Sequence, residues 1–105
     1  MADWIYFIHP PRPDFVATIT PDEAAIMQGA HSDYLQSLYD DGRLLLAGPT
    51  TGGTLDDGLT LFEADDEEEA RAVMAADPAI TSGLMTGELR RMRVSFLRGR
   101  DEPAP

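Results

Sequence analysis

The chain has 105 residues, the size of one ordinary domain, and 43% of them are hydrophobic, which is enough for a real core. Its 19 acidic and 8 basic residues give a formal net charge of −11, which argues against nucleic acid and membrane surfaces as partners. It contains no cysteine, so disulfides, thiolate nucleophiles and thiolate metal sites are excluded. No apolar run is long enough to span a membrane and the N-terminus lacks a signal pattern, so we expect a cytoplasmic protein.

The N-terminal half predicts a strand, a loop and a helix. Residues 3–8 are rich in aromatic and β-branched side chains, which is typical of a central strand buried on both faces. The prolines within 9–13 end this strand, and the segment to Ile19 is a predicted loop, long for so small a domain. The sequence Thr-Pro-Asp-Glu at 20–23 has the pattern of a capping box, so a helix is predicted over 21–40.

The C-terminal half predicts a hairpin, a second helix and a last strand. Its glycine-rich and Asp-Gly stretches indicate turns, and its run of carboxylates indicates a helix start, where acidic groups oppose the positive end of the helix dipole. The predicted elements are a strand over 43–47, a hairpin loop over 50–57, an antiparallel strand over 59–64, a helix from Asp65-Asp66 to near Asp77, one helical turn within 78–85 and a strand over 88–97.

The order strand, helix, strand, strand, helix, strand predicts an α+β protein with a ferredoxin-like fold, in which two helices cover one face of a four-stranded antiparallel sheet. We expect a single domain over 1–98 and a disordered, charged and proline-containing tail over 99–105. The other face of the sheet would be uncovered, and the last strand would bring arginines to it. We therefore expect a homodimer that encloses a partly polar cavity.

His31 occupies an unusual place in the predicted helix. Met27, Tyr34, Leu35 and Leu38 fall on the same helical face, so the imidazole lies within the apolar stripe that faces the core. A group that titrates near neutrality is thereby placed where water is scarce, which favours a functional site. A lone histidine on an apolar face is also commonly a hydrogen-bonded core residue, and both interpretations stay open from the residues alone.

Several short motifs occur in a characteristic order along residues 3–98. They are Tyr6-Phe7-Ile8, His31-Ser32-Asp33-Tyr34-Leu35, Gly42-Arg43-Leu44 followed by Ala47-Gly48-Pro49, Glu68-Glu69-Ala70 and Asp77-Pro78. Together they resemble the YCII (YciI-like) family. The resemblance implies a ferredoxin-like dimeric α+β barrel whose active site is a His–Asp pair, here His31 and Asp77. The enzymatic precedents of the family are a dehydrochlorinase-type activity on a chlorinated aromatic breakdown product and a likeness to muconolactone isomerases.

The implied pair makes chemical sense, because a carboxylate that accepts from one imidazole nitrogen leaves the other nitrogen free as general base or acid. Asp77 precedes a proline, so it has a plain alternative role as a turn or N-cap residue. Gly48 and Pro49 are predicted to bring the backbone close to the site at a strand end. Arg93 is a candidate anion stabiliser if its face lines the cavity, with Ser95 on the same face; otherwise Arg93 is a rim residue.

No metal or cofactor is expected. His9 and His31 are 22 residues apart, without the spacing of a ligand pair or a Cys/His cluster. The glycines between 48 and 58 are not followed by a helix and the chain contains no lysine, so they do not form a phosphate-binding loop.

Two functions remain open from the sequence. In the first, the protein is an acid–base enzyme of the lyase (dehydrochlorinase) or isomerase type, acting on a small organic acid or lactone through His31 and Asp77. In the second, it is a non-catalytic dimeric module that binds a small ligand or serves a neighbouring enzyme, and the pair is structural. An arginine at the cavity would allow the ligand to be anionic.

Overall fold

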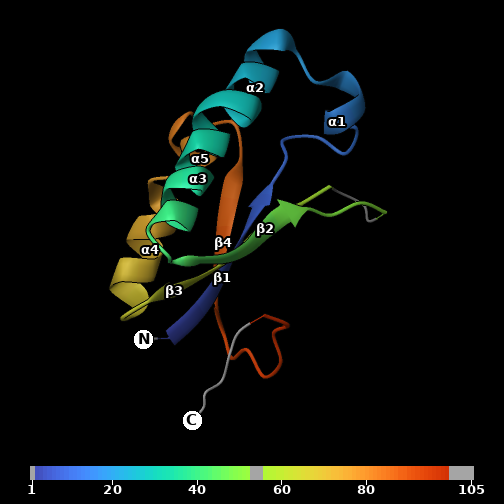
Figure 1. Cartoon of the computed structure of the whole chain (residues 1–105). Helices are drawn as coiled ribbons and strands as arrows, with labels where there is room; N and C mark the ends of the chain where they lie inside the picture. The colour runs from blue at the N-terminus through green and yellow to red at the C-terminus, as the bar shows by residue number, and fades with distance from the viewer. Residues whose placement is uncertain (1, 53–55, 100–105) are drawn as a thin grey trace.

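The computed structural model describes residues 2–52 and 56–99 (Figure 1). In chain order the elements are β1 (Ala2–His9), α1 (Phe15–Thr18), α2 (Pro21–Ala25), the π-helical segment η1 (Ile26–His31), α3 (Ser32–Asp40), β2 (Leu44–Pro49), β3 (Gly58–Ala64), α4 (Glu67–Ala75), α5 (Pro78–Thr81) and β4 (Thr86–Met92). None of the helices in the described part of the chain is long and apolar enough to cross a membrane.

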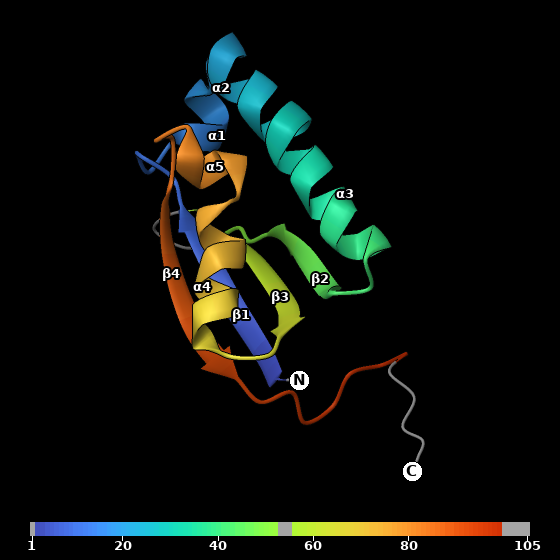
Figure 2. The same cartoon turned by 90° about the vertical axis from the view of Figure 1, so that its left-hand side faces the viewer.

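The four strands form one antiparallel sheet in the order β2-β3-β1-β4. The apolar strand β1 is central, as predicted, and pairs with β3 on one side and β4 on the other. Figures 1 and 2 show α2, α3, α4 and α5 together on one face of this sheet. The predicted ferredoxin-like α+β fold is therefore confirmed.

The core lies between the sheet and the helices. Along β1 every second residue is buried, so Trp4, Tyr6 and Ile8 point toward the helices. Thr60 and Phe62 of β3 pair with Tyr6 and Trp4 and share this face. The rings of Tyr6 and Phe62 meet edge to face with centroids 5.7 Å apart. Tyr6 is fully buried, so its hydroxyl requires a partner within the core.

The opposite face of the sheet carries apolar side chains that no helix covers. Ile5 and Phe7 of β1 are only partly buried, Leu46 of β2 is 43% exposed, and Met92 of β4 is 36% exposed. We call the surface formed by these four residues the open sheet face.

The predicted helix over 21–40 is present but is not uniform. It begins with the predicted capping box, in which Thr20 Oγ1 accepts from the Glu23 amide at 3.2 Å and Glu23 accepts from the Thr20 amide at 2.9 Å. Between Ile26 and His31 the helix widens into a π-helical turn that contains Gly29, a weak helix former. Because a π turn holds more residues than an α turn, it changes the direction in which His31 points relative to α2.

Three local predictions differ from the structure. The short helix α1 lies within the predicted loop. Strand β2 continues through Pro49, which an edge strand tolerates because one side of it needs no backbone donor. Strand β4 ends at Met92 instead of residue 97, because Met92 pairs with Asp3 and β1 extends only one residue further. The predicted tail beyond Gly99 and residues 53–55 of the predicted hairpin loop lie outside the described residues.

Candidate functional site

Asp77 is the centre of a buried hydrogen-bonded group. It is the N-cap of α5, and its Oδ1 accepts from the amide of Ala79 at 2.9 Å. Its Oδ2 accepts from the hydroxyl of Tyr6 at 2.7 Å, and its Oδ1 also lies 2.7 Å from Nδ1 of His31. The carboxyl group has no solvent exposure. A carboxylate this deeply buried is held in the core by several donors from different elements.

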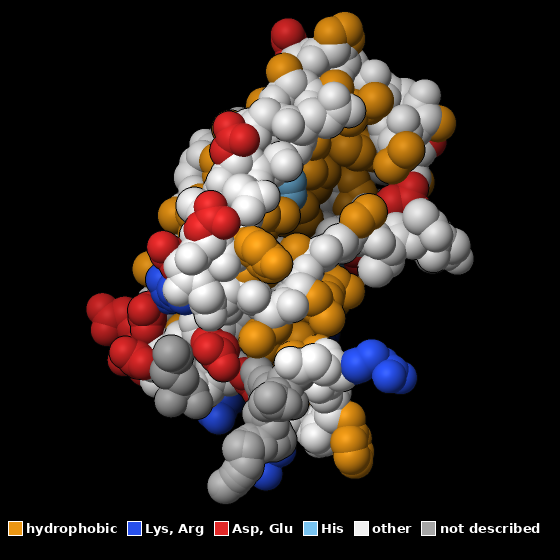
Figure 3. Space-filling view, viewed as in Figure 1, with side chains coloured by type: hydrophobic (Ala, Val, Ile, Leu, Met, Phe, Trp, Pro, Cys, Tyr) orange, Lys and Arg blue, Asp and Glu red, His pale blue; other side chains and the backbone are white. Residues whose placement is uncertain are grey.

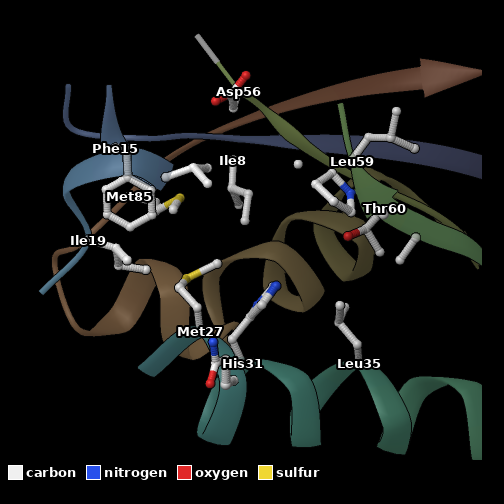
Figure 4. A pocket seen from close by; sticks show the side chains of 16 residues that line it. Ile8, Phe15, Ile19, Met27, His31, Leu35, Asp56, Leu59, Thr60 and Met85 are labelled. Carbon is white, nitrogen blue, oxygen red and sulfur yellow. The ribbon is translucent and has the colours of Figure 1, made fainter. Parts of the chain in front are cut away.

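His31 ends the π-helical segment with an 11% exposed side chain. A carboxylate can only accept hydrogen bonds, so this contact suits a His31 ring that carries a proton on Nδ1. Within the described residues, Nε2 of His31 forms no hydrogen bond. Figure 4 shows the imidazole extending from its helix into a pocket, so the unpaired nitrogen belongs to the part of the ring that a bound molecule can reach.

Tyr6 and Tyr34 respond to the same buried charge. Burial, and then the negative charge of Asp77, raises the pKa of Tyr6 well above its usual value, so this tyrosine stays protonated and remains a donor. Burial and the charge of Asp77 also raise the pKa of Tyr34, whose hydroxyl donates to the carbonyl of Val73 at 2.6 Å. Tyr34 thereby fixes α3 against α4, while Tyr6 fixes the carboxylate.

The pocket lies between η1, α1 and the sheet and has a volume of about 420 Å³. This volume falls within the ~300–1,000 Å³ typical of small-molecule sites. Figure 3 shows the hollow lined by hydrophobic side chains with a histidine at its edge. The lining residues are Ile8, Phe15, Val16, Ile19, Met27, Gln28, His31, Leu35, Ala47, Gly48, Pro49, Asp56, Gly58, Leu59, Thr60 and Met85.

The structure brings together four of the six predicted site residues. His31 and Asp77 are in contact, and Gly48 and Pro49 line the pocket from the end of β2. Arg93 and Ser95 do not line it; they follow the last residue of β4 in an exposed segment, beyond the region where the sheet borders the pocket. The register of β4 also turns Arg91 toward the helix side of the sheet, where its guanidinium lies 5.4 Å from the centre of the Trp4 ring.

The pocket lining therefore contains no cationic side chain among the described residues. Its polar side chains are those of His31, Thr60, Gln28 and Asp56, and only Asp56 is an acid. A carboxylate ligand would meet no arginine here and would face the charge of Asp56. The lining favours an uncharged molecule with an apolar body over an anion.

The loop that follows β1 closes one end of the pocket. Phe15 of α1 is 4% exposed and lines the pocket. The guanidinium of Arg12 lies 5.1 Å from the centre of this ring and donates to both carboxylate oxygens of Glu23, at 2.8 and 3.0 Å. The hydrogen bonds from Arg12, followed by the one from the Thr20 amide, lower the pKa of Glu23 to about 2. The ion pair thus ties α1 to the first turn of α2.

His9, the other histidine, lies outside the pocket. Its Nδ1 is 3.0 Å from Asp57 and its Nε2 is 3.1 Å from Glu88. Its pKa is raised, chiefly by the hydrogen bond to Asp57 and further by the bond to Glu88. Among the residues that the structure describes, no group of three or more His, Cys, Asp or Glu side chains could hold a metal ion.

Two residues that the structure places in the site were not assigned to it from the sequence. Tyr6 was placed in a buried strand, but nothing in the sequence connects it with Asp77, which is 71 residues away. Thr60, which is 3% exposed, lines the pocket beside its cross-strand partner Tyr6. The alternation of β1 with Trp4 and Ile8 indicated the face of Tyr6 but not its partner.

Comparisons with known proteins agree with this fold. A family model described as YCII-related domain matches residues 4–93. The solved structure of 5-chloro-2-hydroxyhydroquinone dehydrochlorinase (TftG) from Burkholderia phenoliruptrix AC1100, in complex with 2,5-dihydroxybenzoquinone, is similar with a TM-score of 0.61 and 19% sequence identity. The match covers 86% of this chain and 93% of that chain. A comparison with curated proteins gave no match.

Proposed function

The chain belongs to the YCII-related family, and we propose that it is a small proton-transfer enzyme of the lyase or isomerase type. His31 is the general base and acid, and Asp77 orients its ring. The observation that carries the proposal is the hydrogen bond of 2.7 Å between His31 Nδ1 and the buried Asp77, which leaves Nε2 to the pocket. This division of the two ring nitrogens is what proton transfer by histidine requires.

The chemistry needs few groups. In an elimination, Nε2 accepts a proton from the substrate, the electron pair left behind forms a new double bond, and the leaving group departs with its bonding electrons. In an isomerisation, the same nitrogen returns the proton to a different atom. The Asp77 carboxylate stabilises the imidazolium formed in either case. General acid–base catalysis of this kind contributes roughly 10²–10⁴-fold to a rate.

The substrate that we propose is a small cyclic molecule without a carboxylate. TftG, whose structure is similar, was solved with the quinone 2,5-dihydroxybenzoquinone. In this chain the apolar walls suit a ring, and Thr60 and Gln28 offer hydrogen bonds to its oxygens. The absence of a cation from the described lining favours a lactone or an uncharged hydroxylated ring over the organic acid that the sequence also allowed.

Activity can be tested on chlorinated hydroquinones and unsaturated lactones, each compared with a carboxylated analogue. Chloride release and NMR-detected deuterium uptake from D₂O report elimination and proton exchange. We expect turnover of uncharged compounds, a loss of about 100-fold or more in His31→Gln, and little change in His9→Gln. Exchange that survives in His31→Gln, or an absence of exchange with every compound despite binding, would contradict the proposal and favour the non-catalytic binding module.

We also infer that the protein is a homodimer that pairs through the open sheet face. The support is the apolar character of that face, where Ile5, Phe7, Leu46 and Met92 are left uncovered by the helices. Contiguous apolar surface of this kind is commonly an interface. Ile5→Glu would place a charge at its centre, and we expect light scattering to change from a dimer to a monomer. A wild-type monomer at millimolar concentration would remove this inference and leave the proton-transfer proposal unaffected.

A further inference from the structure

The segment that follows β4 extends away from the rest of the molecule. Residues 93–99, which we call the C-terminal arm, are outside regular secondary structure. The Val94 amide donates a hydrogen bond of 3.4 Å to Asp3 of the body. Figure 1 shows the arm leaving the lower end of the sheet on the side away from the helices. In Figure 2 it crosses from the β4 edge toward the β2 edge.

The arm exposes a large apolar side chain. Phe96 is 97% exposed, whereas the other three phenylalanines, Phe7, Phe15 and Phe62, are buried or partly buried. Met92, which immediately precedes the arm, is 36% exposed and belongs to the open sheet face. The chain therefore carries an exposed aromatic side chain four residues after the last residue of the open sheet face. An aromatic residue exposed beside such a surface is typical of an interface anchor.

The charge of the arm is opposite to that of the body. Residues 1–92 contain 17 acidic and 5 basic residues, a net charge of −12, whereas the arm contains two arginines and no acid, a net charge of +2. Arg93 and Arg98 are exposed and form no ion pair with the described residues. In Figure 3 many of the acidic side chains gather on the helix side of the body, away from the arm.

We propose that the C-terminal arm of one copy docks on the body of a second copy of this chain, with Phe96 as the apolar anchor and Arg93 and Arg98 as the charged contacts. This rests on the proposed dimer through the open sheet face and adds a second contact to it. Two bodies with a net charge of −12 repel each other, and an arm with the opposite charge that reaches past the sheet reduces this repulsion. The arm leaves on the side from which the second sheet would approach.

The dimer dissociation constant, measured by analytical ultracentrifugation of the full chain, tests the proposal. We expect Phe96→Ser to weaken dimerisation by about 10-fold or more. We expect the double variant Arg93→Glu with Arg98→Glu to weaken dimerisation similarly. The difference from the wild-type dissociation constant should decrease as salt is added. The matched controls are Tyr39→Ser, which removes a 65% exposed aromatic from α3, and Arg71→Glu on α4. Both controls should dimerise as the wild type does.

A second measurement establishes that the contact is between copies. The chain has no cysteine, so Ser95→Cys provides a single attachment site for a spin label. Spin-labelled protein at natural isotope abundance is mixed with ¹⁵N-labelled protein that carries no spin label. Broadened amide signals in the ¹⁵N copy would then show that the arm docks on a partner. Unchanged dimerisation of Phe96→Ser, with no broadening in the mixture, would overturn the arm contact while leaving the sheet-face dimer in place. A wild-type monomer would overturn both.

Discussion

Both histidines of this chain contact carboxylates, but with opposite consequences. His9 is 29% exposed, and both of its ring nitrogens are paired, one with Asp57 and the other with Glu88. His31 is nearly buried and uses one nitrogen on Asp77, while the other is left to the pocket. His9 thus joins residues at the ends of three strands, whereas His31 has the arrangement that the proposed proton transfer requires. Proximity to an acid alone does not identify a catalytic histidine.

The largest expected difference is in the loss of stability when the carboxylates of Asp77 and Asp57 are each removed. Asp77→Ala removes an N-cap and leaves the buried Tyr6 hydroxyl and His31 Nδ1 without their acceptor, so we expect the free energy of unfolding to fall by about 3 kcal/mol. Asp57→Ala removes a partly exposed contact, and its effect should stay below about 1 kcal/mol. Urea titration measures both. Equal losses would contradict the distinction drawn between the two sites.

A smaller effect is expected at the hydroxyl of Tyr6. Tyr6→Phe preserves the ring in its contact with Phe62 and deprives Asp77 Oδ2 of its donor. Because that oxygen is fully buried, the free energy of unfolding should fall by about 1–2 kcal/mol. Tyr39→Phe, at a tyrosine that is 65% exposed, is the matched control and should be neutral. A stability of Tyr6→Phe equal to that of wild type would show that the hydroxyl does not support the carboxylate.

The smallest effect concerns pH and His9. The pKa of His9 is raised in the folded state, so its contribution to stability is full below its unfolded pKa of about 6.5 and is lost as the pH rises through the folded value. The difference in unfolding free energy between wild type and His9→Gln should be at most about 1 kcal/mol at pH ~5.5 and should decrease toward pH ~8.5. A difference that grows with pH would contradict the paired, charged state of this ring.

Much of the fold was predictable because local patterns and global topology agree. The apolar strand β1, the capping box at Thr20 and the acidic start of α4 each indicate their element, and the order of the elements specifies the sheet. The π turn was not predictable, since Gly29 weakens a helix but does not specify which hydrogen bonds replace the α-helical ones. The end of β4 was also not predictable, because it depends on where the partner strand β1 begins.

The sequence predicted the two central residues of the site better than it predicted their hydrogen-bond partners and the lining of the pocket. His31 and Asp77 came from a periodic stripe and a family resemblance, and the structure places them in contact. The role of Tyr6 could not be predicted without the tertiary structure, because its hydroxyl finds its acceptor only when Asp77, at the start of α5, lies over the sheet. Arg93 was placed by extending the alternation of a strand beyond its last paired residue, and the pocket is consequently without a cation in the described part of the chain.

The most direct test of the account is the tautomer of the neutral His31 ring, read from its ring ¹⁵N resonances in a long-range ¹H–¹⁵N spectrum. The hydrogen bond to Asp77 requires the proton on Nδ1 and an unprotonated Nε2, which is the less common tautomer of a free imidazole. The His31→Gln spectrum assigns the resonances, and His9, with both nitrogens on carboxylates, provides the internal comparison. We predict a neutral His31 ring protonated at Nδ1. A neutral ring protonated at Nε2 would contradict the role proposed for Asp77 and with it the proton-transfer site.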